Sequence, residues 1–104
     1  MTIYALSTGS GVAGIAIIRI SGSDVLKIIK SLTGREIPKP RMATLRKINY
    51  INTSELIDEG IIIWFPGPES YTGEDMAEIH IHGGKAGILA VQNEISKIKN
   101  CRLA

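Results

Sequence analysis

The chain has 104 residues and a net charge of +2 at pH 7, and 44% of its residues are hydrophobic and 21% charged. This length suits one globular domain, and so small a net charge gives no electrostatic argument for binding nucleic acid. The single cysteine, Cys101, excludes a disulfide within the chain, as is typical of a reducing compartment. The apolar runs are far shorter than the ~20 residues that span a bilayer, so we expect a cytoplasmic protein with no membrane segment.

The first half of the chain predicts two strands and a helix. Residues 2–7 form the first predicted strand, and a glycine loop follows at 9–14. Residues 15–21 are an almost continuous β-branched run, which is usual for a strand buried on both faces. Apolar residues at helical spacing over 25–32 then predict an amphipathic helix.

Two signals bound that helix. Ser23 or Asp24 can cap its N-terminus with a side-chain oxygen, and Gly34 can end it in the left-handed conformation. The two prolines in 37–40 exclude regular structure there, because each removes a backbone donor and fixes φ.

The second half predicts a hairpin, a third strand and a second helix. Strands at 43–51 and 55–65 flank a turn signal at 52–54 and should pair with each other. A strand at 76–82 follows, and then a helix that extends to about Lys99, with isoleucines and Val91 along one face. Residues 100–104 resemble the beginning of another strand, so we expect the chain to be a fragment of a longer protein. This order predicts an α+β domain with a mixed sheet and helices packed mainly on one face.

The strand at 76–82 alternates two kinds of residue. Ala77, Ile79 and Ile81 share one face, and Glu78, His80 and His82 share the other, because successive strand residues point to opposite sides. The polar face has three interpretations: a solvated sheet surface, one wall of a binding site, or a metal site built on His80 and His82. Glu78 and His82 are roughly 13 Å apart at Cα, too far for one ion to bridge easily.

Arg19 is the one charged residue in its predicted strand. It either sits at a sheet edge with its guanidinium in water, or directs that group at a ligand carbonyl or carboxylate. The sequence leaves both interpretations open.

No phosphate loop is present. The glycines of 9–14 precede a strand, whereas a phosphate site needs a helix N-terminus there, and Lys85 after Gly83 and Gly84 lacks the upstream glycine of the motif. We therefore expect no GTP hydrolysis by this chain.

Two stretches together carry a specific resemblance. Residues 14–22 (GIAIIRISG) and 65–75 (FPGPESYTGED), with Glu78 and the HGG at 82–84, resemble the N-terminal domain of the MnmE (TrmE) family of tRNA modification GTPases. The stretches IPKPR at 37–41 and IDEG at 57–60 match the same family in order and spacing.

That resemblance implies the fold of the folate-binding domain of the glycine cleavage T-protein, over one N-terminal domain at 1–104. It implies binding of 5-formyltetrahydrofolate or another tetrahydrofolate, and a homodimer formed through this domain. The family's full-length proteins add a helical domain and a GTPase domain that takes GTP, magnesium and potassium. With the partner MnmG they install a carboxymethylaminomethyl or aminomethyl group at C5 of the tRNA wobble uridine, with the folate as one-carbon donor.

Residue by residue, the resemblance places Arg19 and Glu78 at the folate. A second set, implied less directly, completes the wall: Ser70, Tyr71, Thr72, Gly83 and Gly84. The family continues downstream with a lysine that also reaches the folate, so this chain supplies part of the pocket. The resemblance implies no catalytic residue and no metal ligand in this chain.

Two alternatives to folate binding stay open. The domain could be a dimerisation module without a ligand, or a small metal-binding domain that uses His80 and His82.

Overall fold

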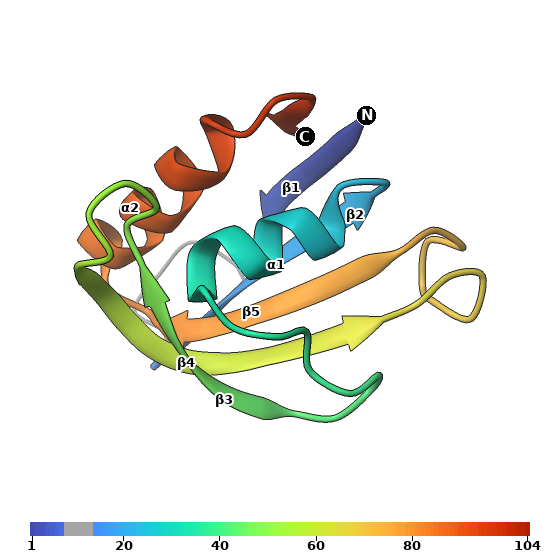
Figure 1. Cartoon of the computed structure of the whole chain (residues 1–104), viewed down its shortest axis with the longest axis horizontal. Coiled ribbons are helices and arrows are strands. Elements are labelled where there is room, and N and C mark those ends of the chain that lie inside the picture. Colours follow the sequence, from blue (N-terminus) through green and yellow to red (C-terminus); the bar gives the residue numbers. More distant parts are fainter. Residues whose placement is uncertain (8–13) are drawn as a thin grey trace.

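The computed structural model describes residues 1–7 and 14–104, which form six strands and two helices (Figure 1). The predicted α+β class and the order of the elements are confirmed. The elements are β1 (Thr2–Leu6), β2 (Ile15–Gly22), α1 (Val25–Thr33), β3 (Thr44–Asn49), β4 (Leu56–Phe65), β5 (Met76–His82), α2 (Lys85–Ser96) and β6 (Cys101–Leu103).

The strands of the described chain form one mixed sheet in the order β3-β4-β5-β2-β1-β6. All neighbours are antiparallel except β1 and β6, which run parallel because α2 carries the chain back across the sheet. The pairing of β2 with β5 lies in the middle, with Ile18 opposite Ile79 and Arg19 opposite Glu78. Thr2 pairs with Cys101, so the two ends of the chain lie side by side (Figure 1).

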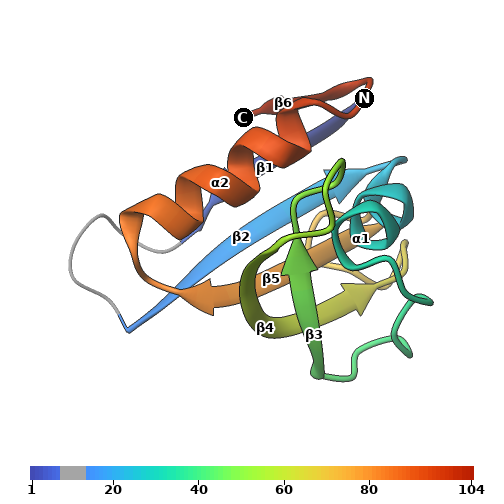
Figure 2. The same ribbon diagram turned by 60° about the vertical axis from the view of Figure 1, so that its left-hand side comes forward.

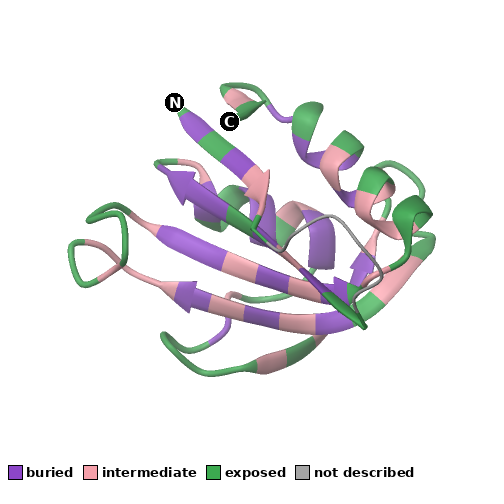
Figure 3. Ribbon diagram, turned by 180° about the vertical axis from the view of Figure 1, so that it is seen from behind, coloured by how far each residue is buried: buried purple, intermediate pink, exposed green. Residues whose placement is uncertain are grey.

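Both helices pack on one face of the sheet, as predicted. Their apolar residues join one core cluster with the inward side chains of β2, β4 and β5. Helix α1 lies beside β3, and α2 contacts β4, β5 and β6 (Figure 2). Seen from behind, the strands lie in front of α1, and their burial alternates along their length (Figure 3). The hydrophobic effect therefore places both helices on one face of the sheet, and no helix of residues 1–7 and 14–104 covers the other face.

The prediction that β2 is buried on both faces was wrong. Ala16, Ile18 and Ile20 are buried, but Ile15 is 57% exposed and Arg19 is exposed as well. The reason is the one-sided helix packing, because a β-branched run predicts a strand but does not say how many layers cover it.

Helix α1 begins and ends where the sequence predicts, but it is not capped as predicted. Asp24 is the N-cap residue, yet its side chain makes no capping hydrogen bond. Instead the Thr2 hydroxyl accepts the Asp24 backbone N–H at 2.8 Å. Gly34 ends the helix with φ of 65°, and its N–H donates to the Lys30 carbonyl.

Helix α2 ends at Ser96, earlier than the predicted Lys99. After the helix, the backbone N–H of Lys97 donates to the Glu94 carbonyl, and that of Ile98 donates to the Ile95 carbonyl. These acceptors lie three residues back rather than four, so the chain tightens into a turn. That turn leads directly into β6.

Neither α2 nor the shorter α1 is long and apolar enough to cross a bilayer.

The predicted hairpin is confirmed in β3 and β4, which pair from Thr44 opposite Ile62 to Asn49 opposite Leu56. A register shift after Ile48 and a left-handed Ser54, with φ of 62°, accommodate the turn.

Gly60 allows β4 and β5 to approach each other closely. A Cβ atom added there would lie 2.1 Å from the His80 backbone oxygen, closer than real Cβ contacts come. Because the obstacle is backbone rather than a flexible side chain, the two strands would have to separate.

We expect Gly60→Ala to destabilise the fold by about 1–3 kcal/mol, since overpacking at a rigid contact forces the backbone to shift. Gly87→Ala is the matched control, because an added Cβ on that helical glycine meets nothing within 4 Å. It should stabilise by roughly 0.5–1 kcal/mol through helix propensity. Urea unfolding of both variants measures the difference, and equal midpoints would contradict the assigned role of Gly60.

Candidate ligand-binding site on the open sheet face

We call the side of the sheet opposite the helices the open face. Because directly paired strand residues point to the same side, the register places Arg19 beside Glu78 and Ile17 beside His80 on this face. The neighbouring strands contribute apolar residues in the same rows: Ala5 from β1, and Ile61, Ile63 and Phe65 from β4.

Arg19 and Glu78 form an ion pair at the centre of this face. The Arg19 Nε atom donates to Glu78 Oε2 at 3.0 Å. Since β2 lies between β1 and β5, the interpretation of Arg19 as an edge residue was wrong. The Arg19 side chain is 45% exposed and the Glu78 side chain 15%, so the pair is open to a ligand from one side.

His80 also contacts the Glu78 carboxylate. Its Nε2 atom lies 3.0 Å from Glu78 Oε1, and since an ionised carboxylate only accepts, the imidazole donates. Partial burial raises the pKa of Glu78, but the hydrogen bonds and charges of His80 and Arg19 outweigh it and hold that pKa below its usual 4.5. Glu78 is therefore an anion at neutral pH.

The loop before β5 closes one end of this cluster. The Arg19 guanidinium lies over the Tyr71 ring, 5.5 Å from its centre, in the geometry of a cation–π contact. The Thr72 hydroxyl is 2.8 Å from that of Ser21 on β2, which fastens the loop to the sheet.

Among the described residues, two small concavities adjoin Arg19. One, of about 70 Å³, is lined by Arg19, Phe65, Tyr71, Met76 and Glu78. The other, of about 150 Å³, lies between the same loop and β1. Both are smaller than the roughly 300–1,000 Å³ of typical ligand pockets, so a larger ligand would lie partly on the open face.

The structure brings only some of the predicted site residues together. Arg19, Glu78, Tyr71 and Thr72 meet around these concavities. Ser70 turns back to donate its hydroxyl to the Glu74 carbonyl within the loop.

Gly83 and Gly84 lie beyond the other end of β5. Gly84 is the N-cap of α2, and the Gly83 N–H donates to the Gly14 carbonyl at 3.3 Å. The sequence analysis considered the loop 9–14 for phosphate binding. Residues 9–13 of that loop lie outside the described residues.

His82 has a partner that the sequence does not reveal. Asp58 on β4 accepts both the backbone N–H of His82, at 2.9 Å, and its Nδ1, at 2.9 Å. Partial burial raises the pKa of Asp58, but the hydrogen bonds from His82 and Glu59 outweigh it, and the net pKa lies below the usual 3.8. This pair ties the end of β5 to β4.

The two histidines thus face different carboxylates rather than one shared ion. Among residues 1–7 and 14–104, no group of three or more histidine, cysteine, aspartate or glutamate side chains is arranged to hold a metal. Cys101 packs partly against the core, where burial raises the pKa of its thiol, so it is no activated nucleophile.

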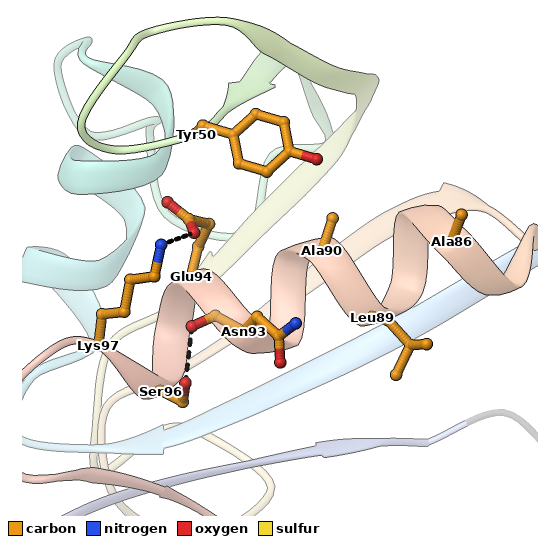
Figure 4. A pocket seen from close by; sticks show the side chains of 8 residues that line it. All are labelled: Tyr50, Ala86, Leu89, Ala90, Asn93, Glu94, Ser96 and Lys97. Atoms are coloured by element: carbon orange, nitrogen blue, oxygen red, sulfur yellow. Dashed lines mark hydrogen bonds and ion pairs between the residues drawn. The ribbon is translucent and has the colours of Figure 1, made fainter.

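A wider groove lies away from this site, between α2 and the β3–β4 turn (Figure 4). It measures about 620 Å³, and Tyr50 overhangs it while Leu89 and Ala90 line the helix side. At one end the buried Glu94 carboxylate accepts the Ile51 N–H and the Lys97 ammonium. These bonds lower the pKa of Glu94 and join α2 to the hairpin.

Phe65 and Met76, which line the concavity, were not predicted as site residues, nor was Asp58. Phe65 and Met76 pair across β4 and β5 and carry no chemical signature of their own. The hydrogen bond between His80 and Glu78 could have been predicted from the sequence, because residues two apart on a strand are neighbours on one face.

The structure is a small α+β domain with a charged cluster on its open face, and comparison with known proteins gives its family. The model of the "GTP-binding protein TrmE N-terminus" family matches residues 2–104. A tRNA modification GTPase MnmE from Pelagibacter ubique is 74% identical over the whole chain, which covers 24% of that protein.

Two more distant relatives agree. A MnmE from Parvibaculum lavamentivorans is 45% identical over 99% of this chain and 24% of its own length. The mitochondrial 5-taurinomethyluridine-(tRNA) synthase subunit GTPB3 of Danio rerio is 47% identical over 99% of this chain and 20% of its own. The chain belongs to the TrmE N-terminal family, and it spans about a quarter or less of the length of these relatives.

We expect Glu94→Ala to destabilise the domain by about 1–3 kcal/mol at pH 7, because it leaves the Ile51 N–H without an acceptor. Glu94→Gln keeps an acceptor and should lose less. Since the pKa of Glu94 is lower in the folded than in the unfolded chain, its stabilisation is present above about pH 4.5 and is lost as pH falls further. Thermal unfolding from pH 7 to pH 3 should show a flatter profile for both variants, and an unchanged profile would contradict this role.

Proposed function

We propose that this domain binds 5-formyltetrahydrofolate, or a related tetrahydrofolate, on the open face as part of a tRNA-modifying GTPase. The observation that carries the proposal is the ionised Glu78 carboxylate beside Arg19 at the concavity. A pterin ring presents a ring N–H and an exocyclic amine side by side, and one carboxylate can accept both. Membership of the TrmE N-terminal family supports the part of the proposal that places this domain in a tRNA-modifying GTPase.

The surroundings suit a flat, partly polar ring. Phe65 and Met76 give apolar contact beside Glu78, and Tyr71 provides an exposed aromatic face. Arg19 can donate further N–H groups to a folate carbonyl or carboxylate, since its Nε alone bonds Glu78.

A second candidate function is homodimerisation, alone or together with folate binding. The open face exposes large apolar residues, with Ile3 at 41%, Ile15 at 57% and Leu45 at 58%. A second copy of the chain would bury them and would add walls to a concavity too shallow for a whole folate.

In the full-length protein we place this domain beside a GTPase domain that takes GTP, magnesium and potassium. There the folate would supply the carbon that the protein, with MnmG, attaches at C5 of the tRNA wobble uridine.

Calorimetric titration with 5-formyltetrahydrofolate, in the full-length protein, tests folate binding. We expect Glu78→Ala and Arg19→Ala each to weaken binding about ten- to a hundredfold, because each removes charge-assisted hydrogen bonds to the ligand. Glu55→Ala and Arg35→Ala, which remove the same charges away from the open face, should bind as the wild type does. If the wild type binds no better than an Arg19→Ala, Glu78→Ala double variant, the proposal fails.

Sedimentation velocity at micromolar concentration tests dimerisation. We expect the wild type to sediment as a dimer and Ile15→Asp to shift it towards monomer, because the charge would be buried against an apolar partner. Leu89→Asp is the matched control, since Leu89 is 53% exposed but lies on α2, on the helix side. A monomeric wild type, or equal effects of both substitutions, would count against an interface on the open face.

A further inference from the structure

The Glu78 carboxylate is held by two donors, one on each oxygen. Arg19 Nε lies 3.0 Å from Oε2, and His80 Nε2 lies 3.0 Å from Oε1. The donors come from different strands, β2 and β5, so they fix the carboxylate independently. An ionised carboxylate has about four acceptor sites, so each oxygen keeps one for a ligand.

His80 is itself restrained. In the sheet register it stands directly opposite Ile17 on β2 and Ile61 on β4, and its side chain is only 24% exposed. An imidazole flanked by apolar side chains has few polar partners, which leaves Glu78 as its hydrogen-bond acceptor in this part of the structure.

We propose that His80 is a positioning residue for the ligand site, which with Arg19 holds the Glu78 carboxylate oriented and ionised so that its remaining lone pairs accept two adjacent ligand N–H groups. This inference rests on the proposed folate binding and adds to it a residue that need not touch the ligand. A carboxylate tied by one oxygen could rotate, and restraining it before binding lowers the entropy lost on binding.

The charged groups around His80 favour this arrangement. Glu78 on its own strand and Arg19 on β2 are the ionised groups of its cluster, while β4 presents isoleucine beside it. His82, two residues further, is engaged by Asp58 instead. The direction of the pKa shift of Glu78 agrees with a donor at each oxygen.

Two variants of His80 separate positioning from packing. His80→Phe keeps a ring of similar size but removes the donor, whereas His80→Gln keeps an N–H that can reach Glu78. His82→Gln is the matched control, because it breaks a histidine–carboxylate pair on the same strand face without changing Glu78.

The first readout needs no ligand. A carbon-13 NMR titration of the Glu78 side chain should show a higher pKa in His80→Phe than in the wild type, with little change in His80→Gln and none in His82→Gln. Equal values in all four proteins would overturn the positioning role, whatever the outcome for folate.

The second readout is the affinity for 5-formyltetrahydrofolate. We expect His80→Phe to weaken binding about five- to tenfold, as for the loss of one hydrogen bond, and His80→Gln to restore most of it. In a Glu78→Ala background, His80→Phe should change the affinity less than about twofold, because its effect passes through Glu78. If His80→Phe lowers the affinity as much in the Glu78→Ala background as in the wild type, His80 acts independently of Glu78 and the positioning role is wrong. If no protein binds folate while the pKa of Glu78 still responds to His80, the proposed function fails and the positioning stands.

Discussion

The antiparallel pairing of β2 with β5 is the constraint on which the rest of this structure depends. It aligns Ile18 with Ile79 on the core side and Arg19 with Glu78 on the open face. Because side chains alternate, a slip of one residue would drive the charged pair into the core and expose the isoleucines. The cost of burying an unmatched guanidinium or carboxylate makes that alternative much less stable. The same hydrophobic pattern that forms the core therefore places the site.

One-sided helix packing leaves one face of the central strands uncovered by either described helix. Both helices contribute to one core cluster, so the opposite rows of β2 and β5 are free to carry polar chemistry. Ile98 continues that cluster past the end of α2, where the chain turns into β6. β6 then extends the sheet beyond β1. β2 itself lies between β1 and β5, so Arg19 meets its partner Glu78 on a neighbouring strand.

The sequence predicts the elements well because each has a local signal, such as helical spacing in α1 or the turn before β4. It could not predict how many layers cover a strand, so β2 was expected to be buried on both faces, whereas Ile15 is exposed. The site divides in the same way. Alternation alone placed Glu78 and His80 on one face, but the pairing of Glu78 with Arg19 needs the register between strands distant in sequence. Asp58 stayed unnoticed for that reason, since only the fold brings it to His82.

The arrangement of donors around Glu78 explains how a small domain can keep an anion ready on a largely apolar face. Without these donors, partial burial would raise the pKa of the carboxylate, because burial disfavours the charged form. Arg19 and His80 reverse that tendency, and they do so while leaving one acceptor site on each oxygen. The desolvation of the carboxylate is thus largely compensated within the folded domain, before a ligand arrives. For the proposed folate, two neutral N–H groups would then add their hydrogen bonds to a carboxylate whose charge Arg19 and His80 already compensate.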